Sequence, residues 1–560
     1  MVALQGKGVY GGIAIGTAAL YRRGRLEVSA EPACDPAEEL ARFEAAKQSA
    51  LSELQGLYDK AVREVGEKDA QIFQIHQMMV EDLDYQDAVI NRIQNQKASA
   101  AYAVSETSKE ISGIFAAMED EYMRERAADV RDISARLLKF LTGVSAGGLR
   151  TEGKCIVCAD DLVPSETVQL DKENVLAFAT AYGSANSHTA ILARTMNIPA
   201  VIGLGEEFLR EEFEGKTMAV DGFTGRVYLD PDEGALEELR QKQAEEERKK
   251  ALLQQLKGKE NRTLDGRSIQ VYANIGGLDD LNAVLENDAG GIGLFRSEFL
   301  YLENSDYPSE EEQFRVYRQA AERMAGKRVI IRTLDIGADK QIGYFGLEPE
   351  ENPALGYRAI RICLTRKDLF KTQLRAICRA SAYGNLAILF PMIISRRELR
   401  EAKALLKEAQ EELRREGTAF DEKMEIGVMI ETPASVIISD QLAAEADFFS
   451  VGTNDLTQYT LAADRQNPKL EPFCDPHHEA VLRMIQMAAE QAHRHGAWIG
   501  ICGELGGDLE LTEVFLAMGI DELSAAPGKV LPLREKIRSL DLTGREQQIL
   551  DRALVCETEK

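Results

Sequence analysis

The stretch that decides the fold is IGVMIETPASVIISDQLAAEADFFSVGTND, residues 426–455. It begins and ends with short apolar runs, IGVMIETP and FFSVGTND, and the segment between them has the apolar spacing of a helix. Two buried strands joined by a helical crossover form a parallel β-α-β unit. Polar residues, Glu431, Asn454 and Asp455, stand at the ends of the two runs. The stretch therefore predicts two neighbouring parallel strands that carry polar side chains to one edge.

The same unit recurs on both sides of this stretch. Six more strand-like runs alternate with helical patterns such as SEEEQFRVYRQAAERMAG and HHEAVLRMIQMAAEQAHRHG. Eight strands in this order are typical of a closed parallel (β/α)8 barrel, the TIM barrel. The six runs are RSIQVYANI (267–275), GIGLFRSEFLY (291–301), RVIIRTLDI (328–336), LAILFPMII (386–394), WIGICGEL (498–505) and DELSAAP (521–527).

The N-terminal part of the chain predicts a different, multidomain α/β arrangement. Short strand-like runs at the start give way, from about Pro36 to Leu141, to apolar positions at helical spacing, and strand-like runs then return. We therefore expect an all-helical insertion in one α/β domain whose two flanks share a sheet. The expected domains are the α/β domain (1–30 and 145–230), the inserted helical domain (31–144), a linker helix (231–262), the barrel (263–535) and a C-terminal tail (536–560).

Composition limits the possible partners and the compartment. The formal net charge of −26 disfavours nucleic acid and anionic membranes and favours a basic protein partner. The 8 cysteines are scattered through 560 residues, unlike a small disulfide scaffold, which favours a reducing cytoplasm. Cys155 and Cys158 form a single CxxC without a second ligand pair, so we expect core residues rather than a zinc site. We find no signal peptide or membrane-spanning run and expect a cytoplasmic protein.

Polar residues stand at the carboxyl ends of nearly all eight barrel strands, where the active sites of such barrels lie. Two arginines at strand ends, Arg296 and Arg332, would suit a phosphate and a carboxylate, and Arg358 and Arg465 in neighbouring loops could join them. A single arginine in such a place is more often a structural ion pair. The full set of strand ends is Asn274, Arg296, Arg332 with Asp335, Met392, Glu431, Asn454 with Asp455, Cys502 with Glu504, and Ser524.

The acids and the cysteine at these strand ends point to a more specific chemistry. Glu431 and Asp455 end adjacent strands and could share Mg²⁺, which takes one or two carboxylates together with phosphate oxygens of a substrate. Cys502 alone would be read as a buried apolar thiol. Its place between acids and next to Gly503 favours a proton donor.

One histidine stands apart from the other five. His188, in GSANSHTAILARTMNIPAVIGLG, lies between a loop of small residues and a helical pattern with Ser187 as its N-cap. The positive end of a helix would stabilise a phosphoryl group on the ring and keep a ring nitrogen free as a nucleophile. A capping or core histidine is an equal alternative for this motif alone. The other histidines fall in helical patterns and are expected to be exposed or structural.

At this point the chain resembles enzyme I of the bacterial phosphoenolpyruvate:sugar phosphotransferase system over essentially its whole length. The matching motifs include DDLVPSETVQLD, SHTAILAR, GIGLFRSEFLY, IRTLDIGADK, NPALGYRAIR, FPMI, ETPAS, GTNDLTQYTLAADR and GICGEL. The loop before the histidine departs from the family, reading GSANS where Gly-Gly and then Arg-Thr-Ser are common. The resemblance implies a phosphohistidine at His188, substrate binding by Arg296, Arg332, Asn454 and Arg465, Mg²⁺ binding by Glu431 and Asp455, and protonation of the enolate by Cys502.

The resemblance also implies partners. The helical insertion resembles the docking surface for HPr, the small histidine carrier protein, and its acidic residues Glu81 and Asp82 would suit an electropositive partner. An ordinary solvated helix face is the simpler interpretation of those two residues. A homodimer through the barrel is implied by the resemblance alone.

Two alternatives remain open. A pyruvate phosphate dikinase or phosphoenolpyruvate synthase shares the histidine domain and the barrel, but it needs a nucleotide-binding domain, and the helical block has no glycine-rich phosphate loop. A non-catalytic sensor of phosphoenolpyruvate would have no need for both a nucleophile, His188, and a proton donor, Cys502.

Overall fold

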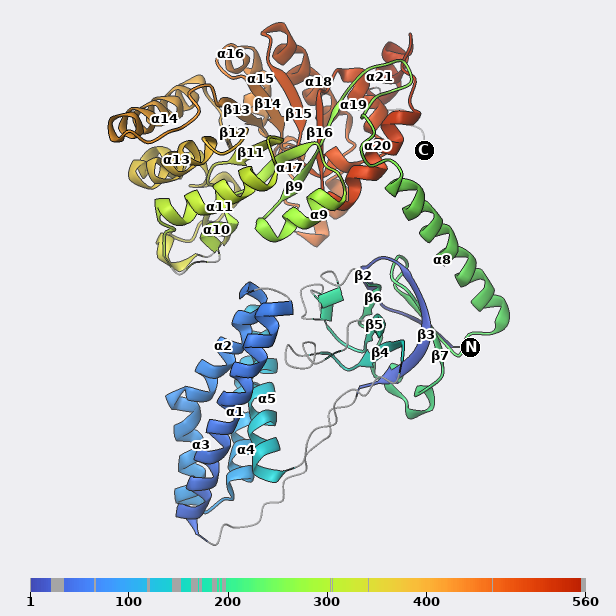
Figure 1. Cartoon of the computed structure of the whole chain (residues 1–560), viewed down its shortest axis with the longest axis vertical. Helices are drawn as coiled ribbons and strands as arrows, with labels where there is room; N and C mark the ends of the chain where they lie inside the picture. The colour runs from blue at the N-terminus through green and yellow to red at the C-terminus, as the bar shows by residue number, and fades with distance from the viewer. Residues whose placement is uncertain are drawn as a thin grey trace. The chain divides into compact units, whose positions relative to one another are not determined.

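The structure is a computed structural model, and it divides into two compact units, Met1–Lys249 and Lys250–Lys560, which are taken separately (Figure 1). None of the helices in the described part of the chain is long and apolar enough to cross a membrane. The described residues are 2–21, 35–64, 67–117, 121–143, 153–162, 170, 174–183, 189–190, 192–193, 198–302, 304, 306–340, 342–465 and 467–554.

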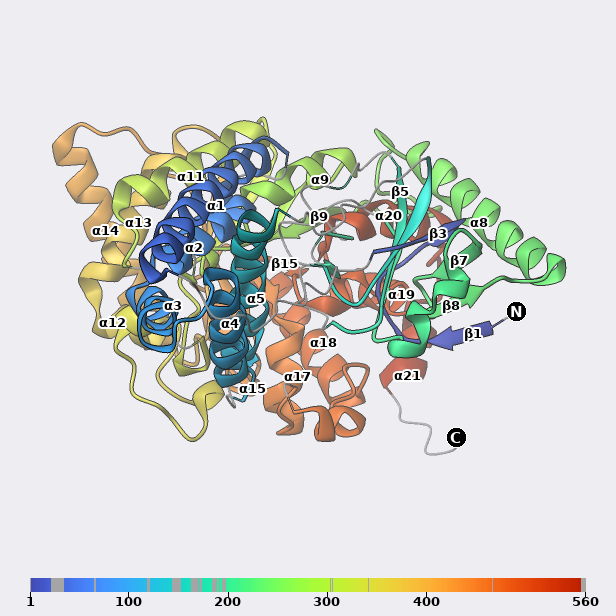
Figure 2. The same cartoon turned by 90° about the horizontal axis from the view of Figure 1, so that it is seen from below.

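The predicted helical block of the first unit is confirmed as a bundle of helices. Apolar residues at helical spacing, among them Phe43, Leu54 and Phe73, are fully buried in one core between the helices. Figure 2 shows the helices of the bundle running side by side, in agreement with the packing of α4 on α5 and α1 on α2. The helices are α1 (Pro36–Glu64), α2 (Glu67–Glu81), α3 (Leu83–Gln96), α4 (Ala100–Ala116) and α5 (Glu121–Thr142).

The two flanks of this block form one eight-stranded sheet, as the sequence predicted. The strand before the insertion, β3, pairs in parallel with the strand after it, β4, through Thr17 opposite Cys155. The order across the sheet is β1-β8-β7-β3-β4-β5-β6-β2. The strands are β1 (Val2–Gln5), β2 (Lys7–Tyr10), β3 (Ile13–Leu20), β4 (Cys155–Ala159), β5 (Val175–Thr180), β6 (Ala200–Ile202), β7 (Thr217–Asp221) and β8 (Arg226–Leu229).

A long helix, α8 (Glu233–Gln254), follows the sheet, where the sequence predicted a linker helix. It is rich in charged residues, yet it buries Leu239, and the Gln243 side chain donates a hydrogen bond of 3.0 Å to the carbonyl of Ile13 in β3. The start of α8 is therefore attached to the sheet domain.

The second unit is a closed barrel of eight parallel strands, as predicted. Each strand pairs in parallel with its two neighbours, and β16 closes the ring against β9. All eight predicted runs contain one strand each. The strands are β9 (Gln270–Ile275), β10 (Gly291–Arg296), β11 (Arg328–Arg332), β12 (Leu386–Phe390), β13 (Glu425–Ile430), β14 (Phe448–Val451), β15 (Trp498–Ile501) and β16 (Glu522–Ala525).

Helices surround the barrel and pack their apolar sides on its strands (Figure 1). Ser309 and Ser395 form capping boxes that begin α11 and α14, and the last helix, α21, packs on α18 and α19. The helices are α9 (Leu281–Glu286), α10 (Phe299–Leu302), α11 (Glu310–Arg323), α12 (Ile360–Thr365), α13 (Lys367–Ser381), α14 (Arg396–Glu416), α15 (Pro433–Ile437), α16 (Ser439–Ala443), α17 (Thr453–Leu461), α18 (Glu479–Arg494), α19 (Thr512–Met518), α20 (Val530–Ser539) and α21 (Glu546–Leu554).

Candidate active site

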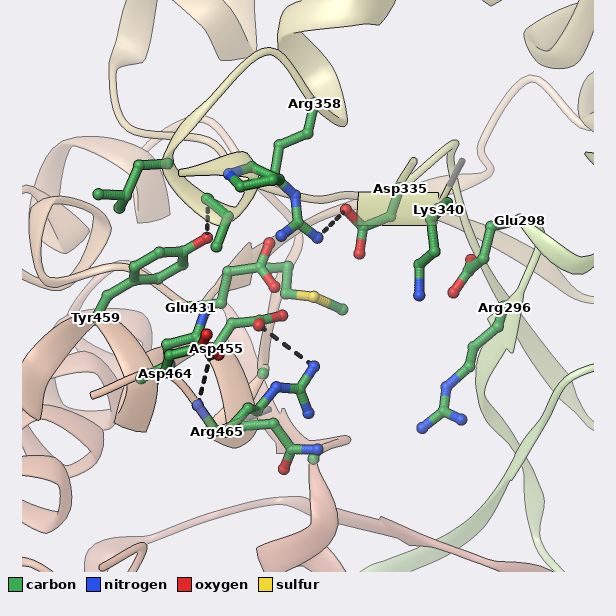
Figure 3. A pocket seen from close by; sticks show the side chains of 18 of the residues that line it. Arg296, Glu298, Asp335, Lys340, Arg358, Glu431, Asp455, Tyr459, Asp464 and Arg465 are labelled. Atoms are coloured by element: carbon green, nitrogen blue, oxygen red, sulfur yellow. Dashed lines mark hydrogen bonds and ion pairs between the residues drawn. The ribbon is translucent and has the colours of Figure 1, made fainter. Parts of the chain in front are cut away.

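A cavity of about 590 Å³ opens at the carboxyl ends of the barrel strands (Figure 3). We call this region the barrel mouth. Every barrel residue that the sequence singled out for binding or chemistry lines this cavity: Arg296, Arg332, Arg358, Glu431, Asn454, Asp455, Arg465 and Cys502. Residues far apart in the sequence are therefore brought to one site, which is what the alignment of the strand ends predicted.

Two of the arginines are fixed by carboxylates. The Arg332 guanidinium donates to the carboxylate of Glu298 and lies 2.9 Å from Asp335 Oδ2, and Arg358 donates to Asp335 Oδ1 at 2.9 Å. Burial alone would raise the pKa of Asp335, but the two guanidinium groups outweigh burial and hold this pKa down to about 2. Asp335 therefore stays charged and orients both arginines.

Arg296 differs from the other arginines of the site. It ends β10 and points into the cavity (Figure 3). Among the described residues, its guanidinium has no carboxylate within ion-pair distance and no hydrogen-bond partner. Its charge and its five N–H donors are thus available to an anionic ligand.

The opposite wall of the cavity is formed by the helix after β14 and the loop that follows it. Arg465 lies 3.6 Å from Asp455 Oδ1, and its backbone N–H donates to the side chain of Gln458. The side-chain amide of Asn454 donates to Glu504 at 3.3 Å and its oxygen accepts from the Glu504 backbone at 3.1 Å. These contacts hold Asn454 and Arg465 in place at the rim.

Glu431 and Asp455 lie next to one another in the cavity (Figure 3). Burial first, and then the charges of Asp455 and Asp335, raise the pKa of Glu431 to about 8. Acids crowded in this way favour a cation between them, and carboxylate oxygens suit Mg²⁺. No group of three or more metal-ligating side chains occurs in the described parts of the chain.

Cys502 directly follows β15 and is 2% exposed. The Sγ atom of Cys502 lies 3.6 Å from the carbonyl of Val451. The side-chain amide of Asn274 donates to the backbone carbonyl of Cys502 at 2.8 Å. Burial raises the pKa of the Cys502 thiol to about 12, so the sulfur carries its proton at neutral pH. A protonated thiol at the wall of a cavity lined by arginines is suited to giving a proton rather than to attacking a substrate.

Strained backbone positions adjoin two of these residues. Met392 has φ of 55°, and its N–H donates to the carboxylate of Glu431. Ala359, directly after Arg358, has φ of 51°. Non-glycine residues rarely adopt such values, and they persist only where the surroundings enforce them.

Three strand-end residues proposed from sequence do not line the cavity. Asn274 supports the backbone of Cys502, Met392 supports Glu431, and the Ser524 hydroxyl donates to Glu522 inside the barrel. Sequence reasoning also missed Glu298 and Lys340, which do line it. Both lie in motifs that carry the resemblance, GIGLFRSEFLY and IRTLDIGADK, but spacing alone gave them no role.

His188 lies outside the described residues. The neighbouring Thr189 is buried, and its hydroxyl donates to Asp161 at 3.1 Å and accepts from the backbone N–H of Leu162 at 3.3 Å. Leu192 of the predicted helix is also buried. Cys155 and Cys158 are buried in β4, which confirms them as core residues, and of the remaining histidines only His76 is buried.

The helical bundle carries an exposed acidic and apolar surface at the junction of α2 and α3. Glu81, Asp82 and Asp84 are exposed there, and Asp82 caps α3 by accepting from the backbone of Tyr85. Two large apolar side chains beside them, Met78 and Leu83, are 70% and 75% exposed. We call these five residues the α2–α3 surface.

Comparisons with known proteins agree along nearly the whole chain. Three family models match: "PEP-utilising enzyme, N-terminal" over residues 5–126, "PEP-utilising enzyme, mobile domain" over 151–225, and "PEP-utilising enzyme, PEP-binding domain" over 250–542. A phosphoenolpyruvate-protein phosphotransferase of Bacillus sp. (strain S) is 44% identical over 533 residues, covering 94% of this chain and 92% of the relative. Those of Geobacillus stearothermophilus and Priestia megaterium are 44% and 42% identical, covering 94% and 96% of this chain and 92% and 94% of the relatives.

Proposed function

The chain belongs to the phosphoenolpyruvate-protein phosphotransferases. From this premise we propose that phosphoenolpyruvate binds in the barrel mouth and phosphorylates His188. The phosphoryl group then passes from His188 to an HPr-type carrier protein. The observation that carries the proposal is the meeting, in one cavity, of a free guanidinium, two clustered acids and a protonated thiol. These are the groups that can bind a phosphorylated carboxylate and protonate the enolate that leaves after phosphoryl transfer.

Substrate binding follows from the charges of the mouth. Arg296 would pair with the phosphate or the carboxylate, since no acid among the described residues occupies it. Arg358 would stay paired with Asp335, and Arg332 with Glu298 and Asp335, while their remaining N–H groups turn to the substrate. Asn454 and Arg465 would contact it from the opposite wall.

A divalent cation fits between the acids of the mouth. Glu431 and Asp455 would hold Mg²⁺, which supplies positive charge to phosphate oxygens when it is bound. The protein contributes the rest by placing its arginines around the transferring group, because phosphoryl transfer is mainly positioning and charge stabilisation.

The proposed phosphoryl transfer breaks one bond to phosphorus and forms another. The bond between phosphorus and the enol oxygen breaks while a bond forms between phosphorus and a ring nitrogen of His188. The enolate that leaves takes a proton from the Cys502 thiol at its methylene carbon and becomes pyruvate. We expect Cys502→Ala to bind phosphoenolpyruvate but to form no pyruvate, and near-normal turnover of this variant would refute the role.

His188 belongs to the first compact unit and the barrel to the second. The proposal therefore requires His188 to reach the barrel mouth in one step and the helical bundle in the next, with residues 233–258 and their ends as hinges. A disulfide cross-link that locks the two units together should abolish at least one of the two half-reactions. Full activity of the cross-linked protein in both would disprove the motion.

The α2–α3 surface is the proposed docking site for the carrier. Acidic and apolar side chains together suit a basic partner with an apolar patch, and a cytoplasmic location and a barrel-mediated homodimer belong to the same proposal. Leu83→Ser should weaken transfer to the carrier while autophosphorylation continues. Ile114→Ser is a matched control, because Ile114 is 55% exposed on a different helix, α4.

The first experiment is incubation of the purified chain with phosphoenolpyruvate and Mg²⁺, in comparison with His188→Ala. We expect an acid-labile, base-stable phosphoryl adduct and one equivalent of pyruvate from the unaltered chain only. Binding of phosphoenolpyruvate without an adduct would instead support a sensor.

A further inference from the structure

The segment of chain that carries His188 is attached at both ends to the residues at the exit of β4. Strands β4 and β5 are parallel neighbours in the sheet. After β5, the backbone N–H of Ala181 donates to the carbonyl of Ala159 at 3.0 Å. The next residue, Tyr182, donates in the same way to the carbonyl of Asp160 at 2.9 Å. The exit of β4 therefore holds the chain on the N-terminal side of His188.

On the C-terminal side of His188 the attachment is made by side chains. The Thr189 hydroxyl donates to Asp161 Oδ1 at 3.1 Å and accepts from the backbone N–H of Leu162 at 3.3 Å. The same Oδ1 atom also accepts from the Leu162 N–H, at 2.9 Å. Three polar groups thus meet at one place. We call the hydrogen bond between the Thr189 hydroxyl and the Asp161 carboxylate the Asp161–Thr189 link.

The link lies among buried apolar side chains. Thr189 and the next residue, Ala190, are fully buried, and Leu162 is nearly so. Leu162 and Leu192 belong to one apolar cluster together with Phe178 of β5. A hydrogen bond is electrostatically stronger in such surroundings than in water, and a polar group left there without a partner is costly. The link is therefore expected to persist in the folded domain.

An ordinary helix cap does not account for the link. Residues 189–190 and 192–193 are helical, so Thr189 lies in the first described turn of the predicted helix. A capping side chain accepts from a backbone N–H two or three residues further along its own helix. The Thr189 hydroxyl instead donates to the side chain of Asp161, 28 residues away in the sequence. The bond ties two strand exits together rather than closing the end of a helix.

The link acts on His188 through a single peptide unit. Thr189 follows His188 directly in the sequence, and consecutive Cα atoms lie about 3.8 Å apart across a trans peptide bond. A fixed Thr189 therefore limits the positions open to the residue before it. Together with the backbone bonds of Ala181 and Tyr182, the link closes the base of this segment from both sides.

Phosphoryl transfer places a demand on His188 that a closed base would meet. The attacking ring nitrogen must lie in line with the bond that breaks, and a misplacement of about 1 Å can lower the rate by about 10²-fold. Phosphoenolpyruvate is proposed to bind in the barrel, which belongs to the other compact unit. The way His188 is held should therefore change the rate at which bound substrate reacts, but not the affinity for substrate.

We propose that Thr189 and Asp161 are positioning residues that act through His188 and hold its imidazole in the orientation required for phosphoryl transfer. The proposal rests on the proposed function of His188. Neither residue forms or breaks a bond to phosphorus. The link stays formed while the phosphoryl group arrives on the ring nitrogen and while it leaves for the carrier, so both half-reactions depend on it.

The test measures autophosphorylation of the full chain in a single turnover. The purified chain is mixed with Mg²⁺ and increasing concentrations of phosphoenolpyruvate, and the phosphoryl adduct is followed by rapid quench. Thr189→Val keeps the shape of the side chain but removes the hydroxyl. We expect the maximal rate of adduct formation to fall by about tenfold or more. The phosphoenolpyruvate concentration that gives half of the maximal rate should stay unchanged, because the barrel is not altered.

Matched variants exclude a merely structural effect. Thr189→Ser keeps the hydroxyl but packs less well, so it should restore most of the rate only if the hydrogen bond is what matters. Asp161→Ala should slow the reaction as Thr189→Val does, and the double variant should be no slower than either, because both remove one bond. Thr107→Val is the control, since the Thr107 hydroxyl is also buried and accepts from Arg92, but in the helical bundle. This variant should keep the normal rate.

Three results would overturn the inference: an unchanged maximal rate in Thr189→Val, a loss in Thr189→Ser as large as that in Thr189→Val, or additive losses in the double variant. Thermal unfolding shows whether each variant is folded, and Asp161→Ala tests the same bond if Thr189→Val is not. His188→Ala measured in parallel separates the two proposals. A normal adduct in His188→Ala would mean that the role of His188 itself is wrong. No adduct in His188→Ala, together with a normal rate in Thr189→Val, would mean that only the role of the link is wrong.

Discussion

The barrel mouth and the barrel interior each contain a buried glutamate whose pKa is raised to about 8, Glu431 and Glu522, but for different reasons. At the mouth, burial is reinforced by the charges of Asp455 and Asp335. In the interior, burial raises the pKa of Glu522 without help from other acids, while the hydrogen bond from Ser524 and the charge of Arg328 lower it. Crowded acids can be relieved by a cation, whereas an acid surrounded by apolar side chains is relieved only by keeping its proton.

This difference predicts different behaviour for the two glutamates. Glu431 lies among arginines and acids that line an open cavity, where ligand charge can reach it. Glu522 lies among side chains that fill the barrel and does not line the cavity. The same residue type in the same barrel is thus expected to meet a cation in one place and to keep its proton in the other.

The largest effect should come from Arg296, whose guanidinium has no acid partner among the described residues. Arg296→Ala should lower kcat/KM for pyruvate formation by about 10³-fold. The variant loses a guanidinium that would stabilise the negative charge of the transferring phosphoryl group, while the other arginines of the cavity are already paired with carboxylates. Arg296→Lys should recover part of this loss, since lysine keeps the charge without the planar fork. Arg397→Ala, whose side chain is 83% exposed on α14, serves as the control and should leave kcat/KM unchanged. A loss below about tenfold for Arg296→Ala would contradict the assignment.

The second prediction separates the two glutamates by their response to metal. Glu431→Gln should raise the Mg²⁺ concentration required for half-maximal pyruvate formation by about tenfold or more, because an anionic ligand becomes neutral. Glu522→Gln should leave that concentration unchanged. A Mg²⁺ titration of the first turnover measures both. Equal shifts in the two variants would mean that the two sites are not distinct.

The third prediction compares the space around the same two carboxyl groups. A Cβ on Gly500 would meet Glu522 Oε2 at 2.0 Å, whereas a Cβ on Gly452 would meet Glu431 Oε2 at 3.0 Å. Gly500→Ala should therefore lower the free energy of unfolding by about 1–3 kcal/mol, as overpacking does, and Gly452→Ala by less. Urea unfolding of the two variants measures the difference. Adding Glu522→Ala to Gly500→Ala should restore part of the loss, and a failure to do so would show that the clash lies elsewhere.

The mouth could be predicted from sequence to a degree that the interior could not. Strands of a parallel barrel end at one rim, so a polar residue at each strand end could be assigned to a shared site before any coordinates were known. Arg296, Glu431, Asn454 and Cys502 were found in this way. Ion pairs such as Arg332 with Glu298 could not be predicted, because they depend on side-chain directions that spacing does not specify.

The inward-facing Glu522 and Ser524 could not be predicted in the same way, for a physical reason. The run DELSAAP alternates polar and apolar residues, which predicts a strand but not which set faces the barrel. Apolar interiors are the usual case, yet Glu522 and Ser524 face inward and Leu523 packs outward against the helices. The signals that could have indicated this are Gly293 and Gly500, whose missing side chains make room for the acid, but their partners are more than 20 residues away in the sequence.

The smallest effect expected is a change in how stability depends on pH. Glu522 has an ordinary pKa of 4.5 when unfolded and about 8 when folded. Below pH 4.5 both states are protonated and the acid has no cost; as pH rises toward 8 the unfolded state ionises first, so the folded state loses stability. Glu522→Gln removes this titration, and its unfolding midpoint relative to the unaltered chain should rise steadily between pH 5 and pH 8. Thermal unfolding at a series of pH values, without Mg²⁺ and substrate, measures the difference between the two proteins at each pH. A constant difference across this range would mean that Glu522 ionises as easily in the barrel as in water, and the prediction would be wrong.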